Sequence, residues 1–152
     1  WNIFEYKEIV LSHNALINGD FESGRKKWGG FSRNKQHVED DEGNNLVRVT
    51  LGHNIRRLKQ KYKDVVGDKV YYVNANIDRS EVVSGSASVV LKWRKKGGRI
   101  ISQDVISSEL LSLGPVKVVA PEGVDKLVIE LTVTQGEGIA TFDDISIREQ
   151  LF

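Results

Sequence analysis

The stretch NGDFESG at residues 18–24 gives the strongest indication of the fold of this 152-residue chain. It is a polar turn in which Phe21 stands between two carboxylates, and a second acidic pair, FDDI at residues 142–145, lies near the other end of the chain. Carboxylate and carbonyl oxygens are the ligands that calcium prefers. We therefore expect the two stretches to close the fold around one structural Ca²⁺ ion. The alternative is a surface turn and an acidic strand end that never meet.

Composition restricts the class of protein. A length of 152 residues with 39% hydrophobic residues suits one ordinary domain. Lysine plus arginine (22) nearly balances aspartate plus glutamate (21), so the net charge does not favour a nucleic-acid or membrane partner. The absence of cysteine excludes disulfides and thiolate metal sites. No apolar run is long enough to span a bilayer and no signal-like segment opens the chain, so we expect a soluble, processed piece of a larger secreted protein.

Most of the chain has a period of two, which predicts strands. In the clearest strand, residues 70–77, the core face begins at Tyr71, while Tyr72, Asn74 and Asn76 share the other face. Residues 55–66 fit either a helical stripe or a strand, and we choose the strand because the other segments alternate. Further strands are expected at residues 15–17, 46–50, 87–94, 100–101, 116–119, 127–133 and 139–147. With no convincing helix, this pattern predicts an all-β, two-sheet antiparallel β-sandwich.

The last predicted strand carries the second acidic pair. Strict alternation puts Thr141, Asp143 and Ile145 on one face, which aims Asp143 toward the core and Asp144 away from it. A buried carboxylate without a partner is costly, so Asp143 is the better cation ligand. Adjacent carboxylates on opposite faces cannot flank a glycosidic bond as a catalytic pair. We therefore do not expect an enzyme.

Several polar and aromatic residues are candidates for sugar binding. Tyr72, Asn74 and Asn76 combine a flat ring with amides that both donate and accept, which suits vicinal hydroxyls; the alternative is a face covered by a loop. Trp28, in the glycine-rich loop at residues 25–31, either stacks on a sugar or folds back to cap the core.

Positive charge is the other candidate feature. We expect Lys92 and Arg94 to lie beside Asn74 and Asn76. Ten cations fall on two candidate strands and their adjoining turns: Arg56, Arg57, Lys59, Lys61, Lys63, Lys92, Arg94, Lys95, Lys96 and Arg99. If several line a cleft, an acidic glycan becomes a candidate ligand, because arginine binds carboxylates bidentately. The alternative is a solvated face that discourages edge pairing.

Four motifs, taken in order, resemble the carbohydrate-binding module superfamily that includes families 4, 9, 16 and 22, with a galactose-binding-like jelly roll. They are NALINGDFESG at residues 14–24 with Trp28 soon after, GDKVY at 67–71, APEG at 120–123 and TFDDISI at 141–147. The resemblance covers residues 14–148 and implies a jelly-roll sandwich, a structural calcium and non-catalytic glycan binding in a concave cleft. Residues 1–13 are then an edge strand or linker, and residues 14–152 are the module.

The resemblance also implies ligands. By position, it places on the metal the main-chain oxygen of Asp20, the carboxylates of Glu22, Glu42 and Asp143, and the carbonyl of Asn45. Asn76 stands where many members have a cleft tryptophan, which argues against ordinary cellulose or xylan binding. The expected carbohydrate-binding set is Trp28, Arg57, Tyr72, Asn74, Asn76, Lys92 and Arg94.

The resulting prediction is an extracellular, non-catalytic module that binds polysaccharide chains in a concave cleft, with an acidic glycan as one candidate ligand. It would target a linked glycoside hydrolase or polysaccharide lyase to its substrate. Its expected partners are a glycan and the other domains of a larger protein, with neither nucleic acid nor membrane. The alternative is a structural or adhesion β-sandwich domain of a phage tail or surface protein that has no sugar site.

Overall fold

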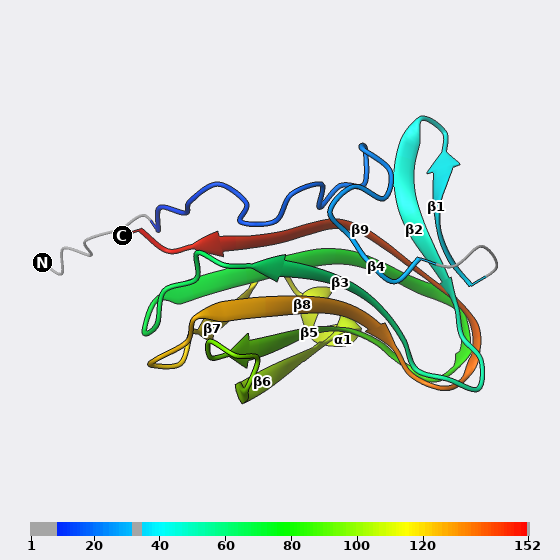
Figure 1. The fold of residues 1–152 in the computed structure, drawn as a ribbon. Coiled ribbons are helices and arrows are strands. Elements are labelled where there is room, and N and C mark those ends of the chain that lie inside the picture. Colours follow the sequence, from blue (N-terminus) through cyan, green and yellow to red (C-terminus); the bar gives the residue numbers. More distant parts are fainter. Residues whose placement is uncertain (1–8, 32–34, 152) are drawn as a thin grey trace, which may run out of the picture.

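Two antiparallel sheets packed face to face make up the computed structural model, which describes residues 9–31 and 35–151 (Figure 1). One sheet has the order β1-β2-β9-β4-β7 and the other the order β3-β8-β5-β6. The elements are β1 Gln36–Asp41, β2 Asn44–Thr50, β3 Arg56–Tyr62, β4 Val70–Ser84, β5 Ala87–Arg94, β6 Ile100–Ser107, α1 Ser108–Leu111, β7 Val116–Val119, β8 Lys126–Val133 and β9 Glu137–Glu149. This confirms the predicted two-sheet β-sandwich. Among the described residues, no helix has the length and apolar character needed to cross a bilayer.

The core lies between the sheets and is built from the predicted alternation. On β4, Tyr71 and Val73 are buried, and on β8 the inward row that begins at Leu127 is closed to solvent. The largest buried side chain is Trp93 on β5, and its indole Nε1 donates to the Asp104 carboxylate at 2.7 Å. The ring therefore adds apolar area to the core without leaving its one polar atom unpaired.

The ambiguous segment forms strand β3, as predicted. Leu58 and Gln60 point inward and are buried, while Lys59 and Lys61, which alternate with them, are exposed. The Gln60 amide donates to the Ile17 carbonyl and accepts from the Ile17 N–H, both at 2.8 Å. A buried carboxamide thus pairs with the backbone of the N-terminal segment, which explains how a polar residue is accommodated on the core face.

The prediction for the N-terminal part was wrong in one respect. Residues 15–17 form bends rather than a strand, although the segment runs alongside β9 (Figure 1) and its Ala15 N–H donates to the Ile147 carbonyl at 2.7 Å. Leu11 makes an isolated bridge with Gln150. The rest of the predicted edge strand or linker, residues 1–8, lies outside the described residues.

The edge of β9 is shared between two neighbours. β2 pairs with β9 as far as Phe142, and the N-terminal segment takes over where the Ile145 N–H donates to the Gly19 carbonyl at 2.9 Å. At this seam β9 has a bulge opposite β4, and Asp144 has φ 51°. Because a bulge adds a residue, Phe142 and Ile145 both face the core. The predicted common face of Thr141, Asp143 and Ile145 is therefore wrong.

Candidate functional site

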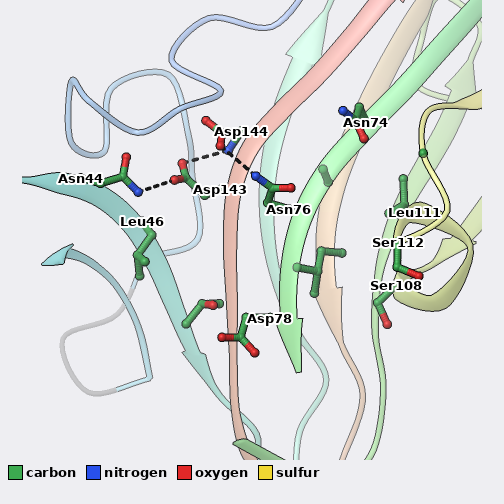
Figure 2. A pocket seen from close by; sticks show the side chains of 14 residues that line it. Asn44, Leu46, Asn74, Asn76, Asp78, Ser108, Leu111, Ser112, Asp143 and Asp144 are labelled. Atoms are coloured by element: carbon green, nitrogen blue, oxygen red, sulfur yellow. Dashed lines mark hydrogen bonds between the residues drawn. The ribbon is translucent and has the colours of Figure 1, made fainter. Parts of the chain in front are cut away.

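A polar groove of about 580 Å³ lies where β2, β9 and β4 meet the helix α1 and the turn after it (Figure 2). Its backbone elements are positioned by the bulge in β9 and by the alternation of β4, which points Val73 and Ala75 into the core and Asn74 and Asn76 outward. The polar side chains that line it are mainly amides and carboxylates: Asn44, Asn74, Asn76, Asp78, Asp143 and Asp144.

A second polar hollow of about 500 Å³ adjoins the first. Asn74 and Asp144 line both hollows, so the polar surface continues across β9 toward the N-terminal segment. The second hollow adds Asn18, Ser146 and Arg148 to the lining. An extended ligand could therefore contact Asn74 from either side.

Hydrogen bonds hold four of the groove side chains in place (Figure 2). The Asn44 amide donates to Asp143 Oδ2 at 2.7 Å, and the Asp144 N–H donates to Asp143 Oδ1 at 2.8 Å. The Asn76 amide donates to Asp144 Oδ2 at 2.9 Å. In contrast, the carboxamide of Asn74 has no hydrogen-bond partner within the described part of the chain. Its donor and acceptor atoms are therefore available to a ligand.

The carboxylates of the groove have different environments. Burial raises the pKa of Asp143, which is 8% exposed; the nearby Asp144 and Glu22 carboxylates raise it further, against the hydrogen bonds from Asn44 and from the backbone. Hydrogen bonds from the side chain and backbone of Ser80 lower the pKa of Asp78. Asp78 is therefore an ionised hydrogen-bond acceptor at neutral pH.

The predicted orientation of the acidic pair was wrong. Asp143 and Asp144 both line the groove, although they are adjacent in sequence. The cause is the bulge, in which Asp144 takes a left-handed backbone conformation that aspartate tolerates better than most residues. Strand alternation therefore gives no geometric argument against the two carboxylates acting together.

The predicted aromatic residues do not line the groove. Trp28 is 6% exposed; its Nε1 donates to the Asn18 carbonyl at 2.9 Å and its ring lies 5.3 Å from that of Phe21. It caps the core, which was the alternative interpretation, and it offers no free face to a sugar. Tyr72 lies in a cross-strand row with Lys117 and Arg148, next to the polar surface.

The predicted neighbourhood of cations and amides was also wrong. β4 and β5 follow each other in sequence but belong to different sheets, so Lys92 and Arg94 do not lie beside Asn74 and Asn76. Alternation shows which side chains point away from the core but does not say which sheet a strand joins.

These cations have local roles on the four-stranded sheet. Lys92 Nζ is 2.7 Å from Glu130 Oε2, and Arg57 Nε is 3.5 Å from Glu130 Oε1. Arg94 Nη1 donates to the Gly98 carbonyl in the β5–β6 hairpin at 3.2 Å.

The two acidic ends of the chain do meet, at the seam along β9. Glu22 Oε1 accepts a hydrogen bond from the Asn45 N–H at 3.1 Å, and the Asn45 amide donates to the Phe21 carbonyl at 3.3 Å. Glu22 is close enough to Asp143 to raise its pKa. The sequence therefore identified three residues that the fold brings together, Glu22, Asn45 and Asp143.

The full predicted ligand set does not assemble. The Asp20 carboxylate accepts a hydrogen bond from the Glu22 N–H at 3.2 Å, while Glu42 is exposed in the β1–β2 turn with φ 52°. The described residues contain no group of three or more acidic, histidine or cysteine side chains placed to hold a metal. The predicted cluster of Glu22, Glu42 and Asp143 is therefore wrong, because the hairpin carries Glu42 at its tip.

Sequence reasoning missed part of the groove lining. Ser108 in α1 and Ser112 just after it carried no recognisable pattern, and neither Asn44 nor Thr141, although the latter lies in the TFDDISI motif, was assigned to a sugar site. Asp78 did carry one, because it continues the outward-facing alternation of Asn74 and Asn76 along β4, which runs to Ser84.

No family model and no curated protein matches this chain. Solved structures match its fold. A family 16 carbohydrate-binding module superposes with a TM-score of 0.64 and 14% identity over 88% of this chain and 99% of the module. The chain has the fold of a carbohydrate-binding module. The CBM22-1 and GH10 modules of Clostridium thermocellum xylanase 10B, crystallised with xylohexaose, match with a TM-score of 0.64 and 11% identity over 93% of this chain and 29% of theirs.

The same fold occurs in a protein of another kind. The enzymatically active domain of tailspike protein 4 from bacteriophage CBA120 matches with a TM-score of 0.67 and 11% identity. The match covers 90% of this chain but 21% of the chain of that domain, so this chain spans about a fifth of its length. At these identities the likeness is one of fold.

Proposed function

We propose that this chain is a non-catalytic carbohydrate-binding module whose ligand lies in the groove on the five-stranded sheet. The observation that carries the proposal is the free carboxamide of Asn74, which stands between two polar hollows. An amide that both donates and accepts matches a pair of sugar hydroxyls. The fold shared with carbohydrate-binding modules supports this assignment.

The neighbouring side chains suit the same role. Asn76 is held by Asp144, which fixes its orientation before a ligand arrives and lowers the entropy lost on binding. Asp78 is an ionised acceptor for hydroxyl donors. The groove therefore offers rigid polar contacts in place of the aromatic stacking platform that the sequence lacks at Asn76.

The charge of the groove favours a neutral glycan. Its titratable lining residues among those described are Asp78, Asp143 and Asp144, all of them acids. A uronate placed there would be repelled by like charges. Our proposal for this site is thus a neutral polysaccharide, and the acidic glycan considered from the sequence does not suit it.

We also propose a structural calcium ion at the seam of β9. Asp143 is largely buried beside other carboxylates and, among the described residues, no lysine or arginine is paired with it. This donor set suits a hard cation. The carboxylates of Glu22 and Asp143 would hold the ion together with the main-chain oxygens of Asp20 and Asn45, and the bound charge would fasten β9, β2 and the N-terminal segment together.

The biological setting we propose is an extracellular protein in which this module targets a linked catalytic domain. The xylanase neighbour joins a module of this fold to a catalytic module in one chain. Tethering raises the local concentration of an enzyme on its substrate. The second candidate is a structural domain of a phage tail or surface protein, which the tailspike match favours.

Calorimetric titration with a panel of neutral oligosaccharides tests the groove. The variant Asn74→Ala should weaken binding about tenfold, because losing hydrogen bonds worth about 1.5 kcal/mol changes the Kd by that factor. The matched control is Gln103→Ala, an exposed residue on β6 of the other sheet, which should bind as the wild type does. Failure of every neutral glycan to bind would favour the structural domain, whereas equal affinity of both variants would place the binding site outside the groove.

A further inference from the structure

Lysines gather along the outer side of β3 and at the turns near its ends. We define the lysine track as Lys27, Lys59, Lys61, Lys63, Lys95, Lys96 and Lys126. None of these lysines forms an ion pair with any residue that the structure describes. Seven ammonium groups therefore lie along this side of the molecule without an ion-pair partner among the described residues, although the formal net charge of the chain is only +1.

Two hollows lie along the track. The first, of about 620 Å³, is lined by Lys27, Lys59 and Lys61, with the exposed Ile17 beside them. Lys61 lines this first hollow and Lys63 lines the second. Alternate residues of an extended chain are about 7 Å apart, so the two hollows follow each other along the chain. Together the hollows form a long surface.

The second hollow has about 420 Å³ and is the more basic. Four lysines line it: Lys63, Lys95, Lys96 and Lys126. Asp125 is its one acidic lining residue among those described, and one of its carboxylate oxygens already accepts a hydrogen bond from the Lys96 N–H at 2.7 Å. The hollow therefore keeps a strong positive charge.

The adjoining sheet face does not neutralise the track. Glu130 is the acidic residue nearest in register, opposite Lys59 on β3, but its side chain is fully buried. Its two oxygens face Lys92 and Arg57, at 2.7 and 3.5 Å. These two cations compensate Glu130, so the charge on the track stays free to attract an anion.

We propose that the lysine track is a second binding surface, for an acidic polysaccharide chain. A linear row of point charges matches the repeated carboxylates of a polyuronate, and lysine pairs with a carboxylate without a demand for planar geometry. Of the described residues that line the two hollows, none is aromatic, so the surface lacks the stacking platform typical of proteins that bind single-stranded nucleic acid. The track lies on the four-stranded sheet and the groove on the other, so the two surfaces are distinct.

Affinity electrophoresis in gels that contain polygalacturonate tests the track. Fully methyl-esterified polygalacturonate serves as the uncharged control polymer. The variant Lys59→Gln/Lys61→Gln/Lys63→Gln is compared with Lys35→Gln/Lys69→Gln/Lys117→Gln, in which three exposed lysines elsewhere are replaced. Both variants change the formal net charge from +1 to −2 by removing three positive charges, so they differ only in the location of the change.

The wild type should be retarded by the acidic polymer but not by its ester, and less so as salt increases. The track variant should bind about tenfold more weakly, as expected for the loss of three exposed ion pairs, and the control variant should bind within about twofold of the wild type. Equal losses in both variants, no retardation of the wild type, or tighter binding to a single-stranded polynucleotide would each overturn the proposal. The Asn74→Ala variant should keep its affinity for polygalacturonate, so the two surfaces can fail independently.

Discussion

Replacing Lys92 with methionine should destabilise the fold far more than replacing any other lysine on the same face. Lys92 Nζ lies 2.7 Å from Oε2 of Glu130, a side chain with 0% exposure on the outer face of β8. Within the described residues, the Glu130 oxygens have no partner other than the Lys92 ammonium and the Arg57 guanidinium. The substitution therefore leaves a buried carboxylate with one distant partner.

The size of the effect follows from that environment. Removing one partner of a buried ion pair costs about 3 to 5 kcal/mol. We expect the lower end, about 3 kcal/mol, because Arg57 stays 3.5 Å from Glu130 Oε1. At about 3 °C per kcal/mol for a chain of this length, the Tm should fall by about 9 °C. The double variant Lys92→Met/Glu130→Met should lie within about 1 kcal/mol of the wild type, because an apolar pair can replace a buried ion pair and here packs beside the buried Val90 and Val128.

Urea unfolding of the two single variants and the double variant measures the coupling in a double-mutant cycle. Lys61→Met is the matched control: it lies in the same cross-strand row, on the other side of Val128, and is exposed. Its free energy of unfolding should change by less than about 0.5 kcal/mol. The reasoning is refuted if Lys92→Met behaves like Lys61→Met, or if the effects of the two single substitutions simply add in the double variant.

Three further outcomes are expected. Phe21→Ala should cost about 3 to 4 kcal/mol in urea unfolding, because the ring is 0% exposed and packs on Trp28; a wild-type midpoint would contradict this packing. A chelator should lower the Tm of the wild type but not that of Asp143→Asn, because an ion that binds only the native state stabilises it; an unchanged wild-type Tm would rule out the calcium. With the metal removed by chelator, the folded state holds the Asp143 proton more tightly than the unfolded state, because the pKa of Asp143 is raised above the ordinary value of 3.8. The resulting stabilisation is complete below pH 3.8 and is lost as the pH rises through the raised pKa. Between these two pH values the wild type should therefore lose stability relative to Asp143→Asn. A pH-independent difference in Tm would contradict it.

The positions of most strands in this fold can be predicted from the sequence. Alternation marks the inward residues because a sheet with one face on the core must bury every second side chain. This explains why β3 was correctly assigned, with Leu58 and Gln60 inward. Short strands without such a pattern could not be predicted from the sequence. In β1, for example, the first residue is the polar Gln36, which is nevertheless buried.

Strand pairing could not be predicted in the same way. We expected β4 and β5 to be neighbours because they are consecutive, but β4 lies between β9 and β7, and β5 lies between β8 and β6. The choice of partner depends on contacts between residues far apart in the sequence. The predicted site therefore combined amides and cations that the sandwich separates.

The bulge at the seam of β9 could not be predicted from the sequence for a different reason. Glycine or proline often marks such an irregularity, but here it occurs at Asp143 and Asp144, in a stretch that alternates well. The structural reason is the change of neighbour from β2 to the N-terminal segment, which no local pattern encodes. The bulge is also what turns both carboxylates into the groove.

A net charge near zero hides a separation of charge between the two sheets. The lysines of β3 alternate with core residues, so they share one outer face, and β3 belongs to the four-stranded sheet. The acids of the groove come from β4 and β9, which belong to the other sheet. A sum over the chain cancels these charges, whereas a ligand responds to the face that it meets. The groove proposed for a neutral glycan and the track proposed for an acidic one lie on different sheets of one sandwich, so a protein that bound both polymers would hold them at a fixed separation.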